Sequence, residues 1–247
     1  MSTTTEEVIT SSLAACMKFA KGPSPNDAYE ARVWEMAGAH SFLLNALLHL
    51  YKTAGSIPSE KHCDFAEYAL MWYAAVHHHH EWEESSYYPL FGPKFDTETI
   101  ITEHQIFHDG VERLKDYLVS CIPAGTAWGF GQVSEHTNQV AFDAATFRAL
   151  ISDFAEPLGA HLQQELDYLE PAKLRASGLT EADVKHIGVM TATHMRSLPP
   201  TIFLVYVVLH VPKESGFPPA PGLLRNFVAP YVFWIPYRRL WQFAPQW

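Results

Sequence analysis

The stretch HHHHEWEESSYYP, residues 77–89, places four consecutive histidines and three glutamates within eight positions. His79 and Glu83 within it are four residues apart, and residues at this separation lie on one face of an α-helix, roughly 5–6 Å apart at Cβ. Each such pair can direct two side chains from consecutive turns into the same space. Two more pairs with this spacing follow downstream and one histidine stands alone upstream: His104 and His108, His161 and Glu165, and His40.

These seven side chains predict a metal centre inside a helix bundle. A single ion has no use for seven donors, whereas two ions that share bridging carboxylates would use them all. Imidazole and carboxylate together suit iron or manganese, and no thiolate is placed to favour zinc. We therefore expect a non-haem centre of two iron ions, with manganese as an alternative occupant.

Spacing alone does not fix which histidine and glutamate of the 77–89 stretch face inward. The pair His80 and Glu84 has the same separation as His79 and Glu83. On a helical projection, His79 and Glu83 lie closer to the apolar stripe that includes Val76, so this pair is preferred. The His80 and Glu84 register remains open as the alternative.

A lone histidine on an apolar helix face is usually a hydrogen-bonded core residue. A single pair of ligand-type residues four positions apart also occurs often by chance. Three pairs on separate amphipathic stretches are harder to explain in this way, because burying unpaired imidazoles and carboxylates costs kilocalories for each group. Competing metal motifs are missing from the sequence. It contains no HExxH, no Glu-x-x-His and no paired cysteines.

Composition places the chain among globular proteins. It has 247 residues, 48% of them hydrophobic, and a formal net charge of −10, which disfavours nucleic acid as a partner. Three dispersed cysteines fit a reducing compartment. The acidic N-terminus does not resemble a signal peptide, and the apolar run 202–211 is too short to span a membrane. We expect a soluble, cytoplasmic protein.

Hydrophobic periodicity predicts an all-α fold in three parts. Residues 1–25 are expected to form an N-terminal arm, which is loose or a short helix. Residues 26–171 are expected to form the bundle, and residues 172–247 an extension packed on it. Four helices are predicted in the bundle, over 26–54, 59–86, 96–121 and 139–169.

The predicted extension begins with a capping-box pattern, Thr180-x-x-Asp183, which is typical of a helix start. Its last part, 198–247, is rich in proline and aromatic residues but contains no metal-ligand spacing. We expect this segment to pack against the outside or the mouth of the bundle.

The order of these motifs resembles the hemerythrin-like (HHE cation-binding) family, in particular its fungal members. The 77–89 stretch resembles the family's second-helix segment, EHQIFHDGVERL (103–114) its third and HLQQELDYL (161–169) its fourth. The WQFAP ending (241–245) is also similar to fungal members. The resemblance covers about residues 30–170. Alignment on Pro89 places the family's ligand pair on His79 and Glu83.

The resemblance implies an up-down four-helix bundle with two irons and an oxo or hydroxo group between them. Glu83 and Glu165 would bridge the irons, and family members bind dioxygen or sense oxygen or iron. Our first hypothesis is accordingly a protein that binds and reacts with dioxygen, or senses oxygen or iron. The alternative is a di-iron oxidase or oxygenase that acts on a small organic substrate in a pocket formed with the extension. A signalling domain stabilised by metal is a third possibility.

Overall fold

The structure is a computed structural model, and it describes residues 3–245. Within this range the chain is almost entirely helical, which agrees with the predicted all-α class. The only strands in the described part are β1 (Ala127–Trp128) and β2 (Gln132–Val133), an antiparallel hairpin in the long loop before the fifth helix.

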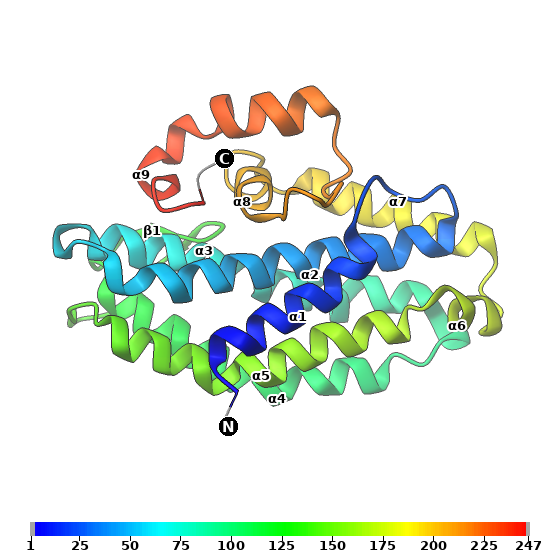
Figure 1. The fold of residues 1–247 in the computed structure, drawn as a ribbon, viewed down its shortest axis with the longest axis horizontal. Helices are drawn as coiled ribbons and strands as arrows, with labels where there is room; N and C mark the ends of the chain where they lie inside the picture. The colour runs from blue at the N-terminus through cyan, green and yellow to red at the C-terminus, as the bar shows by residue number, and fades with distance from the viewer. Residues whose placement is uncertain (1–2, 246–247) are drawn as a thin grey trace.

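Four long helices lie side by side along the longest axis of the molecule (Figure 1). Their bounds are α2 (Ala28–Thr53), α3 (His62–Trp82), α4 (Glu98–Cys121) and α5 (Ala144–Tyr168). They correspond to the four helices expected from periodicity. The start of α5 differs from the predicted Gln139, because the Asp143 side chain accepts a hydrogen bond from the backbone N–H of Thr146 and caps the helix there.

The N-terminal segment takes the second of its two predicted forms, a helix, and not that of a loose arm. Residues Thr5–Ala20 form α1, which starts with a capping box between Thr4 and Glu7 and packs against α2 and α5. Helices α1 and α5 approach closely because Gly159 has no side chain, and a Cβ at that position would come within 2.4 Å of the Ser12 hydroxyl.

Helix α3 ends in a wider turn instead of continuing to residue 86 as predicted. A π-helical turn, η3 (Glu83–Tyr87), follows Trp82, and a 3₁₀ segment, η4 (Tyr88–Lys94), then leads toward α4. Such π-turns are frequent at functional sites because they rotate side chains away from the regular helical register. The turn begins at Glu83, one of the expected metal ligands.

The C-terminal region forms a second layer over α2 and α3 (Figure 1). It contains α6 (Pro171–Ala176), α7 (Glu181–Ser197), α8 (Phe203–His210), η5 (Leu224–Phe233), η6 (Ile235–Tyr237) and α9 (Arg238–Trp241). The predicted capping box at Thr180 and Asp183 is present. Phe217 of this layer packs directly on Gly38 of α2, where a Cβ would lie 2.5 Å from the Phe217 ring.

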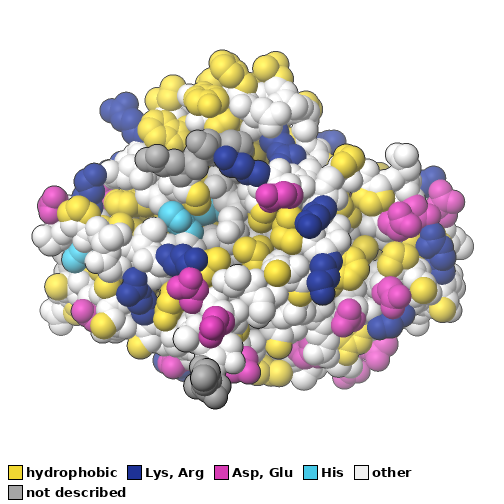
Figure 2. All heavy atoms as spheres, viewed as in Figure 1, with side chains coloured by type: hydrophobic (Ala, Val, Ile, Leu, Met, Phe, Trp, Pro, Cys, Tyr) yellow, Lys and Arg dark blue, Asp and Glu magenta, His cyan; other side chains and the backbone are white. Residues whose placement is uncertain are grey.

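The outer surface of this layer is unusually apolar. Hydrophobic side chains gather there at the top of Figure 2, and several on or beside η5 are more than half exposed: Leu223, Phe227, Tyr231 and Ile235. Among the described residues, no helix combines the length and the apolar character needed to cross a bilayer.

His210 ties α8 to the long helices through a buried hydrogen-bond chain. Its Nδ1 lies 2.7 Å from the Tyr206 carbonyl oxygen, which can only accept, so Nδ1 carries the proton. Its Nε2 therefore accepts from the Tyr68 hydroxyl of α3, 2.5 Å away. Burial lowers the pKa of His210 to about 3, so the neutral ring is the form that fits this site.

We expect His210 to make the protein less stable in acid. A pKa of about 6.5 in the unfolded chain and about 3 in the fold means that the unfolded state binds the extra proton between these pH values. The contribution is therefore complete above pH 6.5 and is lost as the pH falls toward 3. In urea unfolding between pH 6 and 4, His210→Asn should reduce the slope of stability against pH by up to about 1.4 kcal/mol per unit. His186→Asn, at an exposed site on α7, is the control. An unchanged slope in His210→Asn would contradict the expectation.

Candidate metal centre

The structure brings together six of the seven predicted ligands and adds one. They come from all four long helices and from the π-turn after α3. Their side chains form two groups, within each of which the possible ligand atoms lie within 4.8 Å of one another. The two-carboxylate group is His40, His79, Glu83 and Glu165, and the three-histidine group is His80, His104 and His161.

In the two-carboxylate group, each carboxylate faces one imidazole. His40 Nε2 lies 3.1 Å from Glu165 Oε2, and His79 Nε2 lies 3.1 Å from Glu83 Oε1. Both carboxylates are completely buried. In neither pair are the atoms aligned as donor and acceptor, so no hydrogen bond joins them.

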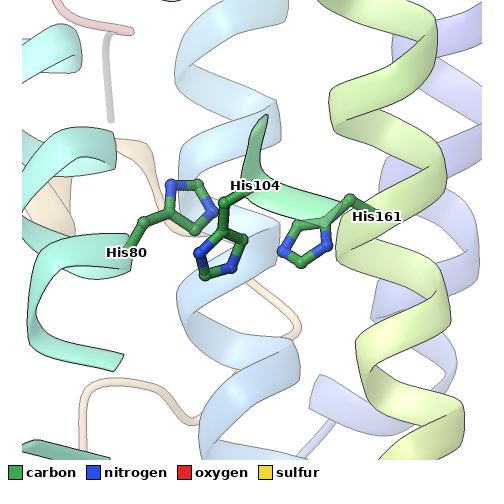
Figure 3. Close-up of side chains that lie close together, drawn as sticks. All are labelled: His80, His104 and His161. Carbon is green, nitrogen blue, oxygen red and sulfur yellow. The ribbon is translucent and has the colours of Figure 1, made fainter. Parts of the chain in front are cut away.

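The three-histidine group is a compact cluster of rings that face one another from three different helices (Figure 3). The centroid of the His104 ring lies 4.6 Å from those of both His80 and His161. Phe107 packs against the same rings, 5.0 Å from His80 and 5.3 Å from His161. This phenyl group forms an apolar wall beside the imidazoles.

The two carboxylates link the groups. Glu83 Oε2 lies 3.9 Å from His104 Nε2, while the other oxygen of Glu83 faces His79. Glu165 Oε2 lies 3.8 Å from His161 Nε2 and also faces His40. Each carboxylate is thus positioned between two imidazoles that belong to different groups, as a bridging ligand would be.

The cluster fits a pair of cations because its inward atoms have no other partner. Buried polar atoms in proteins are almost always hydrogen-bonded, and leaving them unpaired costs free energy. Eight buried atoms of the cluster have no hydrogen-bond partner: the Nε2 atoms of all five histidines, both oxygens of Glu83 and Oε2 of Glu165. Cations coordinated by these atoms would offset that cost.

Contacts on the outer side of the rings orient the ligand atoms inward. His40 Nδ1 donates to the Leu162 carbonyl at 2.7 Å, which leaves its Nε2 as a lone pair. His104 Nδ1 lies 2.6 Å from Glu84 Oε1, and His161 Nδ1 lies 3.3 Å from Glu103 Oε2. Such carboxylate or carbonyl partners commonly fix the tautomer of metal-binding histidines.

Tyr88 plays the corresponding part for a bridging carboxylate. Its buried hydroxyl, on η4, donates a hydrogen bond to Glu165 Oε1. This contact leaves Glu165 Oε2 directed at His40 and His161.

Burial disfavours the charged forms of several residues in the cluster. It lowers the pKa of His79 and His80 well below the usual value and that of His161 to about 2. Burial also raises the pKa of Glu83 well above its usual value, and the neighbouring Glu165 adds to this effect. Neutral imidazoles are the metal-binding form, and nearby cations would favour an ionised Glu83.

His108 does not join the cluster. Half of its side chain is exposed, and its Nδ1 lies 3.6 Å from Asp109 Oδ1. The buried face of α4 follows His104, Phe107 and Val111, so packing turns position 108 toward solvent. The predicted His104–His108 pair therefore supplies only one of its members to the cluster.

His80 takes the remaining place, although the sequence predicts it as a ligand only in the alternative register with Glu84. Adjacent residues on a helix point about 100° apart. His79 therefore enters one group while His80 enters the other. Glu84, the partner of His80 in that register, instead contacts His104 Nδ1 from a partly exposed position. The run of four histidines was the available signal for two neighbouring ligands.

A comparison with known proteins finds a distant relative of this chain. No family model matches the chain, and no solved structure matches it. The protein named "Dimeric xanthone biosynthesis cluster protein R11", from Cryptosporiopsis sp. (strain 8999), is 28% identical over 149 residues. The match covers 58% of this chain and 49% of the relative, so it spans about half of the relative's length. Function is therefore inferred from the geometry of the site.

Two alanine variants can test whether His80, and not His108, is the ligand in the three-histidine group. We expect His80→Ala to lose roughly half of the bound metal, because the three-histidine group would retain only two imidazoles. His108→Ala, its matched control on an exposed side chain, should keep the metal content of the unmodified chain. Elemental analysis of both purified variants gives the measurement. The opposite result, with metal lost only in His108→Ala, would overturn the assignment.

Proposed function

We propose that this chain is a hemerythrin-like protein that binds two iron ions and reacts with dioxygen. In this proposal α2, α3, α4 and α5 form an up-down four-helix bundle around the ions. The supporting observation is the set of eight buried donor atoms that lack any hydrogen-bond partner. Imidazole and carboxylate donors suit iron or manganese. The buried Cys16 thiol, whose pKa is raised to about 12 by burial and by Glu165, is not a competing thiolate.

The two groups suggest how the ions would be divided. His40 and His79 would hold one ion, and His80, His104 and His161 the other, with Glu83 and Glu165 shared between them. When bound in the reduced state, the iron pair would supply the electrons that dioxygen takes up.

The chain's own residues would control water and protons around the centre. Phe107 packs on the three-histidine group and limits the access of water to it. Tyr88 holds its proton against Glu165 Oε1, which fixes the direction of the carboxylate. A separate pocket, lined mainly by polar side chains that include Glu84 and Glu112, reaches His80 and His104. This pocket would serve as a route for small polar species to the centre.

The proposal predicts metal and oxygen chemistry that can be measured directly. Protein purified without oxygen should contain about two iron ions per chain, as the two ligand groups imply. Mixing it with dioxygen in a stopped-flow instrument should change the visible spectrum. His40→Ala and His161→Ala should weaken the change, since each removes one donor from a different group. Protein that contains no iron or manganese, or an iron-loaded protein that does not respond to dioxygen, would refute the proposal.

A second candidate function is an oxidase or oxygenase acting on a small organic substrate, and a pocket favours it. This junction pocket lies between the long helices and the C-terminal layer, with Phe42 of α2, Trp82 of α3, His194 of α7 and Phe203 of α8 in its wall. It also contains His79, a member of the two-carboxylate group. An apolar pocket with a few polar groups beside a reactive centre is the usual form of a substrate site.

The distant relative supports the same alternative, because it is named for dimeric xanthone biosynthesis. A hydroxylated xanthone is accordingly a reasonable first probe for substrate-dependent oxygen consumption.

Two threonines of α7 provide a matched test of the pocket. Thr191 lines it, whereas Thr193 is exposed, and both hydroxyls donate only to a carbonyl of their own helix. If the second function holds, Thr191→Phe should fill the pocket and abolish hydroxyxanthone-stimulated oxygen consumption. Thr193→Phe should retain the stimulation, and both variants should keep their iron. Equal stimulation in the two variants would exclude the pocket as the substrate site.

A further inference from the structure

The junction pocket has a shape and a chemistry that specify more than an apolar cavity. It lies where α2, α3, α7 and α8 meet. Most of its wall is apolar, from Phe42, Ala75, Phe203 and Phe217 among others.

Three nearly parallel rings lie together in this wall. The indole of Trp82 stacks on the imidazole of His194, with centroids 4.7 Å apart and planes 15° apart. The His78 ring is inclined by only 16° to the His194 ring. Since aromatic rings stack preferentially on parallel surfaces, this alignment favours a flat ligand over a bulky or flexible one.

The same histidines offer a hydrogen-bond donor and an acceptor. Their Nε2 atoms lie 3.0 Å apart, so one ring donates its Nε2 proton to the other. In neutral rings the donating imidazole then has an Nδ1 that accepts, and the accepting imidazole has an Nδ1 that donates. Neither Nδ1 has a hydrogen-bond partner among residues 3–245. The two Nδ1 atoms point away from each other, because the Nε2 atoms of the two rings face one another. The pair therefore offers its acceptor and its donor to separate groups of a ligand, a hydroxyl and a carbonyl.

The charges around the pocket favour a neutral ligand. Glu35 is the only carboxylate in the described lining, and its Oε2 lies 2.6 Å from the guanidinium of Arg32. Because these opposite charges pair with each other, the pocket presents no free cation for an acid and no free anion for an amine.

We propose that the junction pocket binds a neutral, flat, fused-ring aromatic compound that carries a hydroxyl and a carbonyl group at separate positions. The ligand stacks parallel to Trp82 and is positioned by hydrogen bonds to the His78–His194 pair. It lies against the ring of His79, whose Nε2 faces Glu83 in the centre. This inference deepens the second proposed function and rests on it for the role of the bound compound, but not for the binding itself.

Equilibrium dialysis against three probes tests the ligand class. The probes are 2-hydroxyanthraquinone, anthraquinone, and 1-tetradecanol, an unbranched alcohol with the same number of carbon atoms. We expect 2-hydroxyanthraquinone to bind most tightly, anthraquinone less tightly and tetradecanol weakest. Tetradecanol binding as tightly as 2-hydroxyanthraquinone would overturn the proposal in favour of a general apolar cavity.

His194→Phe tests the positioning pair, because it keeps a flat ring beside Trp82 but removes both nitrogens. Its affinity for 2-hydroxyanthraquinone should fall about tenfold, the size expected for one or two lost hydrogen bonds. Its affinity for anthraquinone should change less, so that the preference for the hydroxylated probe disappears. His186→Phe, on the exposed face of the same helix, should behave as the unmodified chain. A preference that survives in His194→Phe would refute the role of the pair.

Iron content and the dioxygen response, measured on the same samples, separate this inference from the proposed function. Loss of probe binding in a protein that still binds iron and responds to dioxygen counts against the inference alone. Probe binding in a protein that holds no metal counts against the proposed function and leaves the ligand class in place.

Discussion

Five imidazoles and two carboxylates share one buried space at the centre of this molecule, and their mutual arrangement constrains everything around them. Eight of their atoms have no hydrogen-bond partner. Desolvation lowers the pKa of the histidines it affects and raises that of Glu83, so the group is expensive to bury without positive charge. A cation pair is the arrangement that would turn this cost into a stabilising interaction.

The elements around the cluster can be understood from that requirement. Four long helices are needed because no single helix can place donors on every side of a space. The π-helical turn at Glu83 allows the carboxylate to face His79 with one oxygen and His104 with the other. Outer contacts such as those from Glu84 and Glu103 then fix the ring orientations. The chain thus supplies a buried enclosure in which these contacts hold the donor atoms inward.

The C-terminal layer gives the centre an asymmetric environment. On the side of His79 it closes an apolar pocket with rings from α7 and α8. The pocket that reaches His80 and His104 is lined mainly by polar side chains of α3, η3 and α4. A minimal oxygen-binding bundle has no need for the first of these pockets. In the proposal of an oxidase or oxygenase, this layer would link the metal chemistry to an organic ligand.

Much of this architecture was determined by local sequence signals. Apolar periodicity predicted the four long helices, and the Thr180–Asp183 capping box marked the start of α7, because both depend on neighbouring residues only. The i, i+4 spacing brought His79 with Glu83, and His161 with Glu165, to one face of a helix for the same reason. The boundary of α5 was missed by five residues because the Asp143 cap outweighed the propensity of the preceding segment.

Tertiary packing decided the rest. The sequence pattern treats His104 and His108 alike, but the packing of Phe107 and Val111 sets the rotation of α4 and leaves His108 in solvent. His80 enters the cluster only because helices from three directions meet there. The contact between His78 and His194 joins positions 116 residues apart, which no local periodicity can relate. Spacing along the chain determines which side chains can share a face, whereas the rotation and docking of whole helices determine which of those faces meet.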